Sequence, residues 1–491
     1  MKKCLALILV FATVIMTLVA CVQDNGAEQG TEPENGSQEE TYPDNLPANL
    51  KFNGEDVVVL SRGSQKYTED EIAVPELNSE PVNDAMFNRN IAIADRLNIE
   101  FVSKPIEDAD PFKTVEEVER VVKAGGADYD LFAGACYVTL PSALRGTFYN
   151  LGTLEYLDLS QSYWMQGYND TVSYGESQYT ATGMIALSTY RLAMVTLFNK
   201  KLFDDRSIPY LYDAIENNEW TLDYHAALVE NFYQDLNGNT THDEEDLYGF
   251  VTSADINVDA YWSACDLPLV GKDADEAYTW VLDTQRLSDA VDKLLTLCYE
   301  SGGTYLCKAN ENNTAQPGIR EMFAEGRAAT TTLRLLAVEL DEIRNMQDEY
   351  GIVPMPKFDT VQTDYYTQMH DQFTVFAIPA SVASDKIELI GATMEAMASE
   401  SLRTVKPAYY EIALKRKYMS DPIAWDMLDL AFDHVIVDAG VVYADTMEYP
   451  HHKLRTMIME KKNTVSSQFG RVGSKMNRAL DGIVDKIEKL G

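Results

Sequence analysis

Apolar positions along the chain alternate between two periods. Short runs of nearly continuous apolar or β-branched residues predict buried strands at 57–60, 99–102, 129–134, 194–198, 328–333, 351–355 and 373–378. Between them, apolar residues recur every three or four positions, which predicts helices over 86–97, 115–122, 221–234, 287–298 and 387–397. The last third of the sequence has mainly helical spacing, and Asp421-Pro422 is a typical helix start. This alternation predicts an α/β fold with helices on both faces of its sheets.

The N-terminus departs from this pattern. Lys2 and Lys3 precede an apolar run over 5–19, which is shorter than the ~20 residues that a bilayer span needs, so we interpret residues 1–20 as a signal peptide. Leu18-Val19-Ala20-Cys21 resembles the lipobox of bacterial lipoproteins, in which the cysteine becomes the lipid-modified N-terminus. We therefore expect Cys21 to carry palmitate-type chains and to anchor the protein on the extracellular face of the cell membrane. The alternative is an ordinary secretory signal with an incidental cysteine.

Composition adds two constraints. Residues 22–49 hold seven acidic residues and no basic one, so 21–50 is expected to be a disordered tether. The remaining body of about 440 residues is too long for one hydrophobic core, which indicates at least two lobes. A formal net charge of −38 argues against nucleic-acid binding, because phosphates must be met by Lys and Arg.

Cysteine and histidine positions suggest no metal or redox motif. Cys136, Cys265, Cys298 and Cys307 lack the close spacing of zinc or thiol-exchange sites. A disulfide between Cys298 and Cys307 stays open beside buried free thiols. His451 and His452 are adjacent and no set of carboxylates accompanies them, so we expect them on a surface helix. Trp220 and Trp425 begin or follow helices with regular apolar partners and are expected in the core.

One acidic segment, DLNGNTTHDEEDLYGF (235–250), has nearly the spacing of a calcium loop. Read as twelve positions, it supplies hard oxygen donors, as Ca²⁺ requires. Position 6 is Thr240 where glycine is usual, and position 12 is an aspartate instead of the longer glutamate. We therefore expect weak, structural binding in the range of ~10⁻⁴ to 10⁻³ M, with a solvated acidic turn as the alternative. The predicted ligands are Asp235, Asn237, Asn239, the Thr241 carbonyl, Asp243 and Asp246.

Several segments, taken in order, resemble one family. They are EPVNDAMFNRNIAIADRLNIEF (80–101), YDLFAG (129–134), TLFNKKLF (196–203), EWTLDYHAAL (219–228), MFAEGRAATTT (322–332), YGIVPMPKFD (350–359) and PAYYEIALKRKY (407–418). With the lipobox and the tether, they resemble the extracellular solute-binding lipoproteins of ABC transporters, family 1, the carbohydrate-type substrate-binding proteins. The resemblance covers roughly residues 51–490, and the order of the segments carries it.

The resemblance implies an α/β, two-lobed, periplasmic-binding-protein-like (type II) fold with hinge strands and a helical C-terminal third. Lobe one would comprise 51–190 plus 358–402, and lobe two 191–357 plus 403–491. It also implies capture of a sugar or oligosaccharide between the lobes and delivery to an ABC permease, by a monomeric protein without catalytic activity or an organic cofactor. Loops of this acidic type recur in large members of the family, where they brace lobe two. Binding of another solute, such as a peptide or an acidic oligosaccharide, or a role as a sensor lipoprotein for a signalling receptor, stays open.

A sugar offers apolar faces and a rim of hydroxyls, so its site needs aromatic side chains and groups that donate or accept in pairs. The chain has no nucleophile elbow, zinc helix, phosphate loop or catalytic Cys/His pattern, which disfavours an enzyme. Position relative to the expected lobe crossings selects the candidates for ligand contact. They are Tyr137, Tyr190, Arg191, Trp262, Asp266, Arg334, Tyr366, His370 and Asp371.

Overall fold

The computed structural model describes residues 43–490 except 64, 69, 109, 275, 311–313 and 411–422. The predicted signal peptide, Cys21, most of the tether and the Asp421-Pro422 helix start lie outside the described residues. Within the described residues, no helix combines the length and the apolar character needed to cross a membrane.

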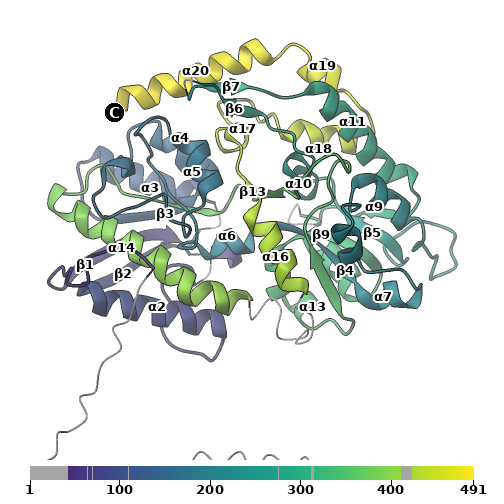
Figure 1. Ribbon diagram of the computed structural model, residues 1–491, viewed down its shortest axis with the longest axis horizontal. Coiled ribbons are helices and arrows are strands. Elements are labelled where there is room, and N and C mark those ends of the chain that lie inside the picture. The colour runs from purple at the N-terminus through teal and green to yellow at the C-terminus, as the bar shows by residue number, and fades with distance from the viewer. Residues whose placement is uncertain are drawn as a thin grey trace, which may run out of the picture. The chain divides into compact units, whose positions relative to one another are not determined.

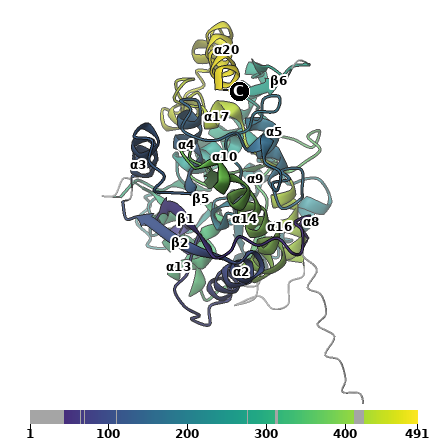
Figure 2. The same ribbon diagram turned by 90° about the vertical axis from the view of Figure 1, so that its left-hand side faces the viewer.

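Sheet one has four strands in the order β12-β3-β1-β2. Strand β1 runs parallel to β2 and β3, whereas β12 joins β3 in the antiparallel direction. Every residue of β3 and β12 is buried, as their continuous apolar runs predict. Helices α2 and α3 lie on opposite sides of β1 and β2 (Figure 2), and α14 packs beside α2. These elements are β1 (Glu55–Arg62), β2 (Ile99–Ile106), β3 (Leu131–Ala135), β12 (Thr374–Ala377), α2 (Pro81–Leu97), α3 (Phe112–Lys123) and α14 (Ile387–Glu400).

Sheet two has five strands in the order β10-β4-β9-β5-β8, and Figure 1 labels β4, β5 and β9 among them. Strands β5 and β8 were not predicted from the apolar pattern. Gly249 interrupts the apolar run in β5, and glycine is needed there because a Cβ would lie 2.3 Å from the Val229 carbonyl oxygen. The strands are β4 (Met194–Asn199), β5 (Tyr248–Thr252), β8 (Thr304–Leu306), β9 (Ala328–Arg334) and β10 (Tyr350–Val353).

The other elements surround and connect the two sheets. The predicted helix over 221–234 is shorter than expected and ends at Val229, but Thr221 is its N-cap and accepts from the Tyr224 N–H. The helix over 287–298 continues into a π-helical turn, Thr296–Glu300, and α14 continues into another, Ser401–Val405. The remaining helices are α4 (Cys136–Ala143), α5 (Gln166–Val172), α6 (Leu187–Arg191), α7 (Lys200–Asp205), α8 (Leu211–Glu216), α9 (Leu222–Val229), α10 (Ile256–Ala264), α11 (Thr284–Leu295), α12 (Gln316–Ala324), α13 (Asp341–Arg344), α16 (Ile423–Asp433), α17 (Ala439–Val442), α18 (His452–Met459), α19 (Val465–Phe469) and α20 (Gly473–Leu490). The short strands are β6 (Val270–Lys272), β7 (Tyr278–Trp280), β11 (Thr367–Gln368) and β13 (Val435–Ile436).

Three segments that connect the regions of the two sheets lie side by side. Ala193, just before β4, bridges to Met369, and the His370 N–H donates to the Leu192 carbonyl at 3.1 Å. The segment that contains Met369 and His370 also pairs on its other side, where its strand β11 runs parallel to β13. The expected hinge strands are therefore present. Sheet one draws on residues 55–135 and 374–377 and sheet two on 194–353, while the predicted residue boundaries of the lobes stay a prediction.

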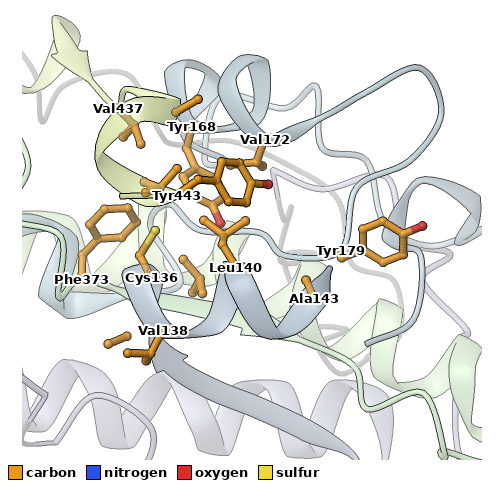
Figure 3. Packing of buried hydrophobic residues seen from close by; sticks show 14 of the residues in the cluster. Cys136, Val138, Leu140, Ala143, Tyr168, Val172, Tyr179, Phe373, Val437 and Tyr443 are labelled. Atoms are coloured by element: carbon orange, nitrogen blue, oxygen red, sulfur yellow. The ribbon is translucent and has the colours of Figure 1, made fainter. Parts of the chain in front are cut away.

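The core beneath α4 fixes the direction of that helix. The Cys136 side chain points into a cluster with Tyr168, Phe373 and Tyr443, in which the four residues are almost fully buried (Figure 3). The Tyr168 and Phe373 rings meet edge to face at 5.8 Å. Because Cys136 is held in this cluster, the next residue, Tyr137, keeps a partly exposed side chain at the end of β3.

Helix α14 carries a buried acid. Glu395 is 2% exposed, and its carboxylate accepts from the Tyr163 hydroxyl, from Trp164 Nε1 at 3.0 Å and from the Asp158 N–H at 3.3 Å. Burial raises the pKa of this carboxyl from 4.5 to about 7, although the hydrogen bonds oppose the shift. Among the described residues no cation pairs with it.

Three side chains test the expectations about buried and surface positions. Trp220 is fully buried, as predicted, and its Nε1 donates to the Pro354 carbonyl at 2.9 Å. Trp425 is only half-buried and packs against Tyr410. The surface position expected for His451 is wrong. It is 3% exposed because it caps α18, which packs on α10, and Trp262 Nε1 donates to its carbonyl at 3.1 Å.

The cysteines of the body are free thiols, so the alternative of a Cys298–Cys307 disulfide is not realised. Cys136, Cys265 and Cys298 are buried and Cys307 is half-buried. Burial raises the pKa of Cys265, Cys298 and Cys307 to about 12, which makes them unreactive packing residues.

Candidate functional site

Polar side chains collect where strands of both sheets end. The parallel strands β1 and β3 end at the same edge of sheet one, and β12 begins there because Thr374 pairs with Ala135. In sheet two, β9 ends at Arg334, opposite the first residue of β4. Ligands of open α/β sheets bind at such carboxyl ends. We call this group the strand-end site; its members are Arg62, Tyr67, Tyr137, Arg334, His370 and Asp371.

Contacts within the strand-end site join the two sheets. The Arg334 guanidinium lies over the Tyr67 ring, 5.9 Å from its centroid, and Arg62 approaches the same ring at 5.5 Å. The Tyr67 hydroxyl donates to the Gln372 side chain, and the Tyr137 N–H donates to the Asp371 carbonyl at 3.3 Å. Residues from β1, β9, α4 and the segment before β12 are thus held together.

A small cavity adjoins these residues. Asp259 and Trp262 of α10 line it together with His370, Asp371 and His451, and its volume is about 350 Å³ including the open mouth. Arg455 of α18 holds Asp259 in a two-point ion pair, with Nε 2.7 Å from Oδ1. Two helices far apart in the sequence therefore contribute an aromatic ring, an imidazole and a paired carboxylate to one wall.

Burial and neighbouring charges shift the titration of these groups. Burial raises the pKa of Asp371 from 3.8 to about 7, with the nearby Asp259 adding to the shift and Arg455 opposing it. Burial raises the pKa of Asp259 to about 6, against the effect of Arg455. His370 has its pKa held well below 6.5, first by burial and then by Arg334, Arg455 and Arg62. Near neutral pH the site therefore presents a neutral imidazole and a carboxyl group that is partly protonated.

Of the nine predicted contact residues, the structure brings five together here: Tyr137, Trp262, Arg334, His370 and Asp371. The Tyr137 ring also meets the exposed ring of Phe112 edge to face at 6.0 Å. Burial and Asp371 raise the Tyr137 pKa, so its hydroxyl stays protonated. An aromatic face with hydroxyl, guanidinium and carboxyl groups around it suits a sugar.

The other four predicted residues lie elsewhere. Tyr190 is buried among the rings of Tyr409, Tyr410 and Phe432. Arg191 is 5% exposed and forms an ion pair with Glu339 at 3.0 Å, which also accepts from the Tyr409 hydroxyl. Asp266 follows α10 and lines a separate cavity, and Tyr366 is half-buried beside His434.

Sequence reasoning missed five residues of the site or its wall: Arg62, Tyr67, Asp259, His451 and Arg455. Arg62 carried a usable signal, because it is a charged residue directly after the apolar run of β1. The other four depend on helices that pack across the site, and no local pattern indicates this.

The acidic loop folds around two carboxylates. Asp235 accepts from the Gly238 and Thr240 N–H groups, and buried Asp246 accepts from the Leu236 N–H. Thr240 adopts φ +62°, the conformation for which a calcium loop uses glycine at this position. The Asn237 and Asn239 amides donate to Asp243, so binding of Ca²⁺ would require both amides to exchange oxygen for nitrogen. Whether the loop holds calcium stays a prediction.

A different trio is the one group of His, Cys, Asp and Glu side chains, among the described residues, whose ligand atoms gather closely. Asp259, His451 and His452 bring one ligand atom each within 4.8 Å of one another. Arg455 already neutralises Asp259 there, so a metal ion would have to compete with a guanidinium for the same oxygens. We assign this trio to the wall of the site.

Comparison with solved structures defines the fold. The ABC substrate-binding protein Lmo0181 of Listeria monocytogenes, solved with cycloalternan, matches with a TM-score of 0.52 and 12% identity, over 89% of this chain and 98% of that one. A cyclo/maltodextrin-binding protein with maltotetraose matches with 0.53 and 13%, over 89% and 98%. The GacH receptor of Streptomyces glaucescens, solved unliganded and with acarbose, matches with 0.55 and 10%, over 87% and 99%.

No protein-family model matches the sequence, and a search of curated proteins finds no significant relative. The chain therefore has the two-lobed, periplasmic-binding-protein-like α/β fold expected from the resemblance, and this is the fold of sugar-binding components of ABC transporters. At these sequence identities the comparison supports the fold alone. The functional argument therefore rests on the residues of the strand-end site.

Proposed function

We propose that this protein is an extracellular solute-binding protein that captures a sugar or oligosaccharide between its two lobes and delivers it to an ABC permease. The observation that carries the proposal is the strand-end site, where aromatic rings and hydrogen-bonding groups from both sheets meet in a fold used by binding proteins. A ligand that contacts both lobes favours the closed arrangement of the lobes, because only in that arrangement can it make all of its contacts.

Capture without turnover fits the chemistry of the site. The carboxylate of Asp259 is engaged in its ion pair with Arg455. The three neighbours described above are named as binding proteins or as a receptor. We propose further that Cys21 anchors the chain to the membrane and that the acidic loop holds a structural Ca²⁺.

Calorimetry with a panel of oligosaccharides tests the binding role. One saccharide class should bind with 1:1 stoichiometry, raise the melting temperature and leave the reaction mixture unchanged. Tyr137→Ala should weaken this binding about tenfold, since it removes a partly exposed ring at the centre of the site. The matched control is Tyr149→Ala, which removes an exposed ring outside it. Release of shorter products would overturn the proposal, and so would unchanged affinity in Tyr137→Ala.

Attachment is tested separately. Cells expressing Cys21→Ser should release the protein into the medium, whereas the wild-type protein stays with the membrane fraction. Equal retention of both would refute the lipid anchor without affecting the binding proposal.

A further inference from the structure

Among the described residues, Arg334 forms no hydrogen bond and no ion pair. It ends β9, faces the Tyr67 ring and is half-buried. Among the described residues no carboxylate or carbonyl accepts any of its five N–H donors. Burial lowers its pKa from 12.5, because the charged form is partly removed from water. A guanidinium in this position therefore has N–H donors available for an acceptor on a ligand.

Arg62, whose guanidinium also approaches the Tyr67 ring, is incompletely satisfied. It is 4% exposed, and its Nη2 donates to the Gln372 carbonyl at 2.8 Å and to Thr374 Oγ1 at 3.0 Å. Among the described residues its Nε and Nη1 have no hydrogen-bond partner. Two guanidiniums from different sheets therefore approach one tyrosine ring with unused donors.

The nearby carboxylates that the structure describes form no hydrogen bond or ion pair with these two arginines. Glu71 is buried and accepts from Ser188 and from the Thr374 hydroxyl. Asp255 caps α10 and accepts from the Ser253 hydroxyl. Asp259 forms an ion pair with Arg455. Each of these acids thus already accepts hydrogen bonds from other groups. Among the described residues Arg334 has no acceptor, and two donor atoms of Arg62 are unused.

The fourth carboxyl, Asp371, is partly protonated near neutral pH, because burial and Asp259 raise its pKa to about 7. It therefore contributes only part of a negative charge to the site. The remaining charge pattern favours an anion from outside, although the whole chain is strongly acidic.

We infer that the strand-end site binds an acidic saccharide, with the carboxylate of a uronic acid in two-point contact with Arg334 and the sugar ring against Tyr137. This inference rests on the proposed saccharide-binding function and names its ligand class. A carboxylate matches the planar fork of arginine, whereas a neutral hydroxyl satisfies one donor and leaves the buried charge uncompensated. Arg62 also approaches the Tyr67 ring and adds a second positive charge at short range.

The first experiment compares matched ligands by calorimetry. The probes are oligosaccharides of two to four units of galacturonate, glucuronate or mannuronate, each beside the same oligomer with its carboxyls reduced to alcohols. At least one acidic oligomer should bind more than tenfold tighter than its reduced form, and its affinity should fall with added salt. Tighter or equal binding of the reduced forms overturns the inference and leaves saccharide capture standing. Binding of no saccharide, including neutral glucans, overturns the proposed function as well.

The second experiment uses variants of one strand. Arg334→Gln should weaken binding of the acidic oligomer by about 10- to 100-fold and change binding of the reduced oligomer little. Arg327→Gln is the matched control, because Arg327 precedes the opposite end of β9 and pairs with exposed Glu325. The melting temperature of Arg334→Gln should be unchanged or higher, since a half-buried charge without a partner is removed. Equal losses for the acidic and reduced oligomers would overturn the assignment of Arg334 to the carboxylate.

Discussion

Glu395 provides a quantitative test of the buried electrostatics. Replacing it by Gln removes the charge and keeps the hydrogen bonds, because the amide oxygen accepts from Trp164 and Asp158 while the amide nitrogen donates to the Tyr163 oxygen. The wild-type carboxyl has its pKa raised from 4.5 to about 7 in the folded protein. Between these two values the folded state binds more protons than the unfolded state, so stability falls as the pH rises and levels off above the folded pKa.

The magnitude follows from the same two values. Integrating the proton linkage between about pH 5 and about pH 8.5, this one carboxyl lowers the free energy of unfolding by about 2–3 kcal/mol. Glu395→Gln should therefore be nearly as stable as wild type at the lower pH and more stable by about this amount at the higher one.

Urea denaturation at several pH values measures the difference between wild type and variant. The control is Glu388→Gln, which changes an exposed glutamate on the same helix and should give a pH-independent difference. A Glu395→Gln curve parallel to that of the wild type would refute the reasoning, since it would mean that burial costs this carboxylate nothing.

Three further predictions concern other parts of the molecule. Glu339→Gln should lower the free energy of unfolding by about 3–5 kcal/mol, because Arg191 stays buried without its counter-charge; urea denaturation measures this, and a loss below about 1 kcal/mol would contradict it. Chelator should lower the melting temperature by a few degrees in the wild type and not in Asp243→Asn, whereas equal curves with and without chelator would leave only an acidic turn. Alkylation of the unfolded, unreduced protein should modify Cys298 and Cys307 fully; a mass two hydrogens short at this pair would reveal a disulfide.

The fold was largely predictable because its central strands are buried on both faces. Continuous apolar runs such as 194–198 and 328–333 can only be satisfied inside a sheet, and they became β4 and β9. The strand β5 escaped notice because Gly249 breaks its run where the chain passes close to Val229. The local pattern thus identifies strands that are continuous apolar runs. It misses a strand in which a close backbone contact requires glycine.

The site was predictable only where it lies on the crossings. Arg334, His370 and Asp371 lie at the ends of strands near the crossings, so their order along the chain indicated this position, and their contact with a ligand stays a prediction. Tyr190 lies beside a crossing too, but its ring turns into an aromatic core that includes Tyr409. Asp259 and His451 come together because α18, late in the chain, packs on α10. The spacing of residues along the sequence does not indicate such a long-range contact.

The late addition of β12 to sheet one has a consequence for biosynthesis. Strand β3 ends at Ala135, yet its antiparallel neighbour begins only at Thr374, whereas all strands of sheet two fall between Met194 and Val353. A chain emerging in order can therefore complete sheet two while β3 still exposes an unpaired apolar edge, which is a template for aggregation. We expect the newly made polypeptide to depend on chaperones until residue 377 has emerged, and folding to be slow because its last sheet closes across such a long loop.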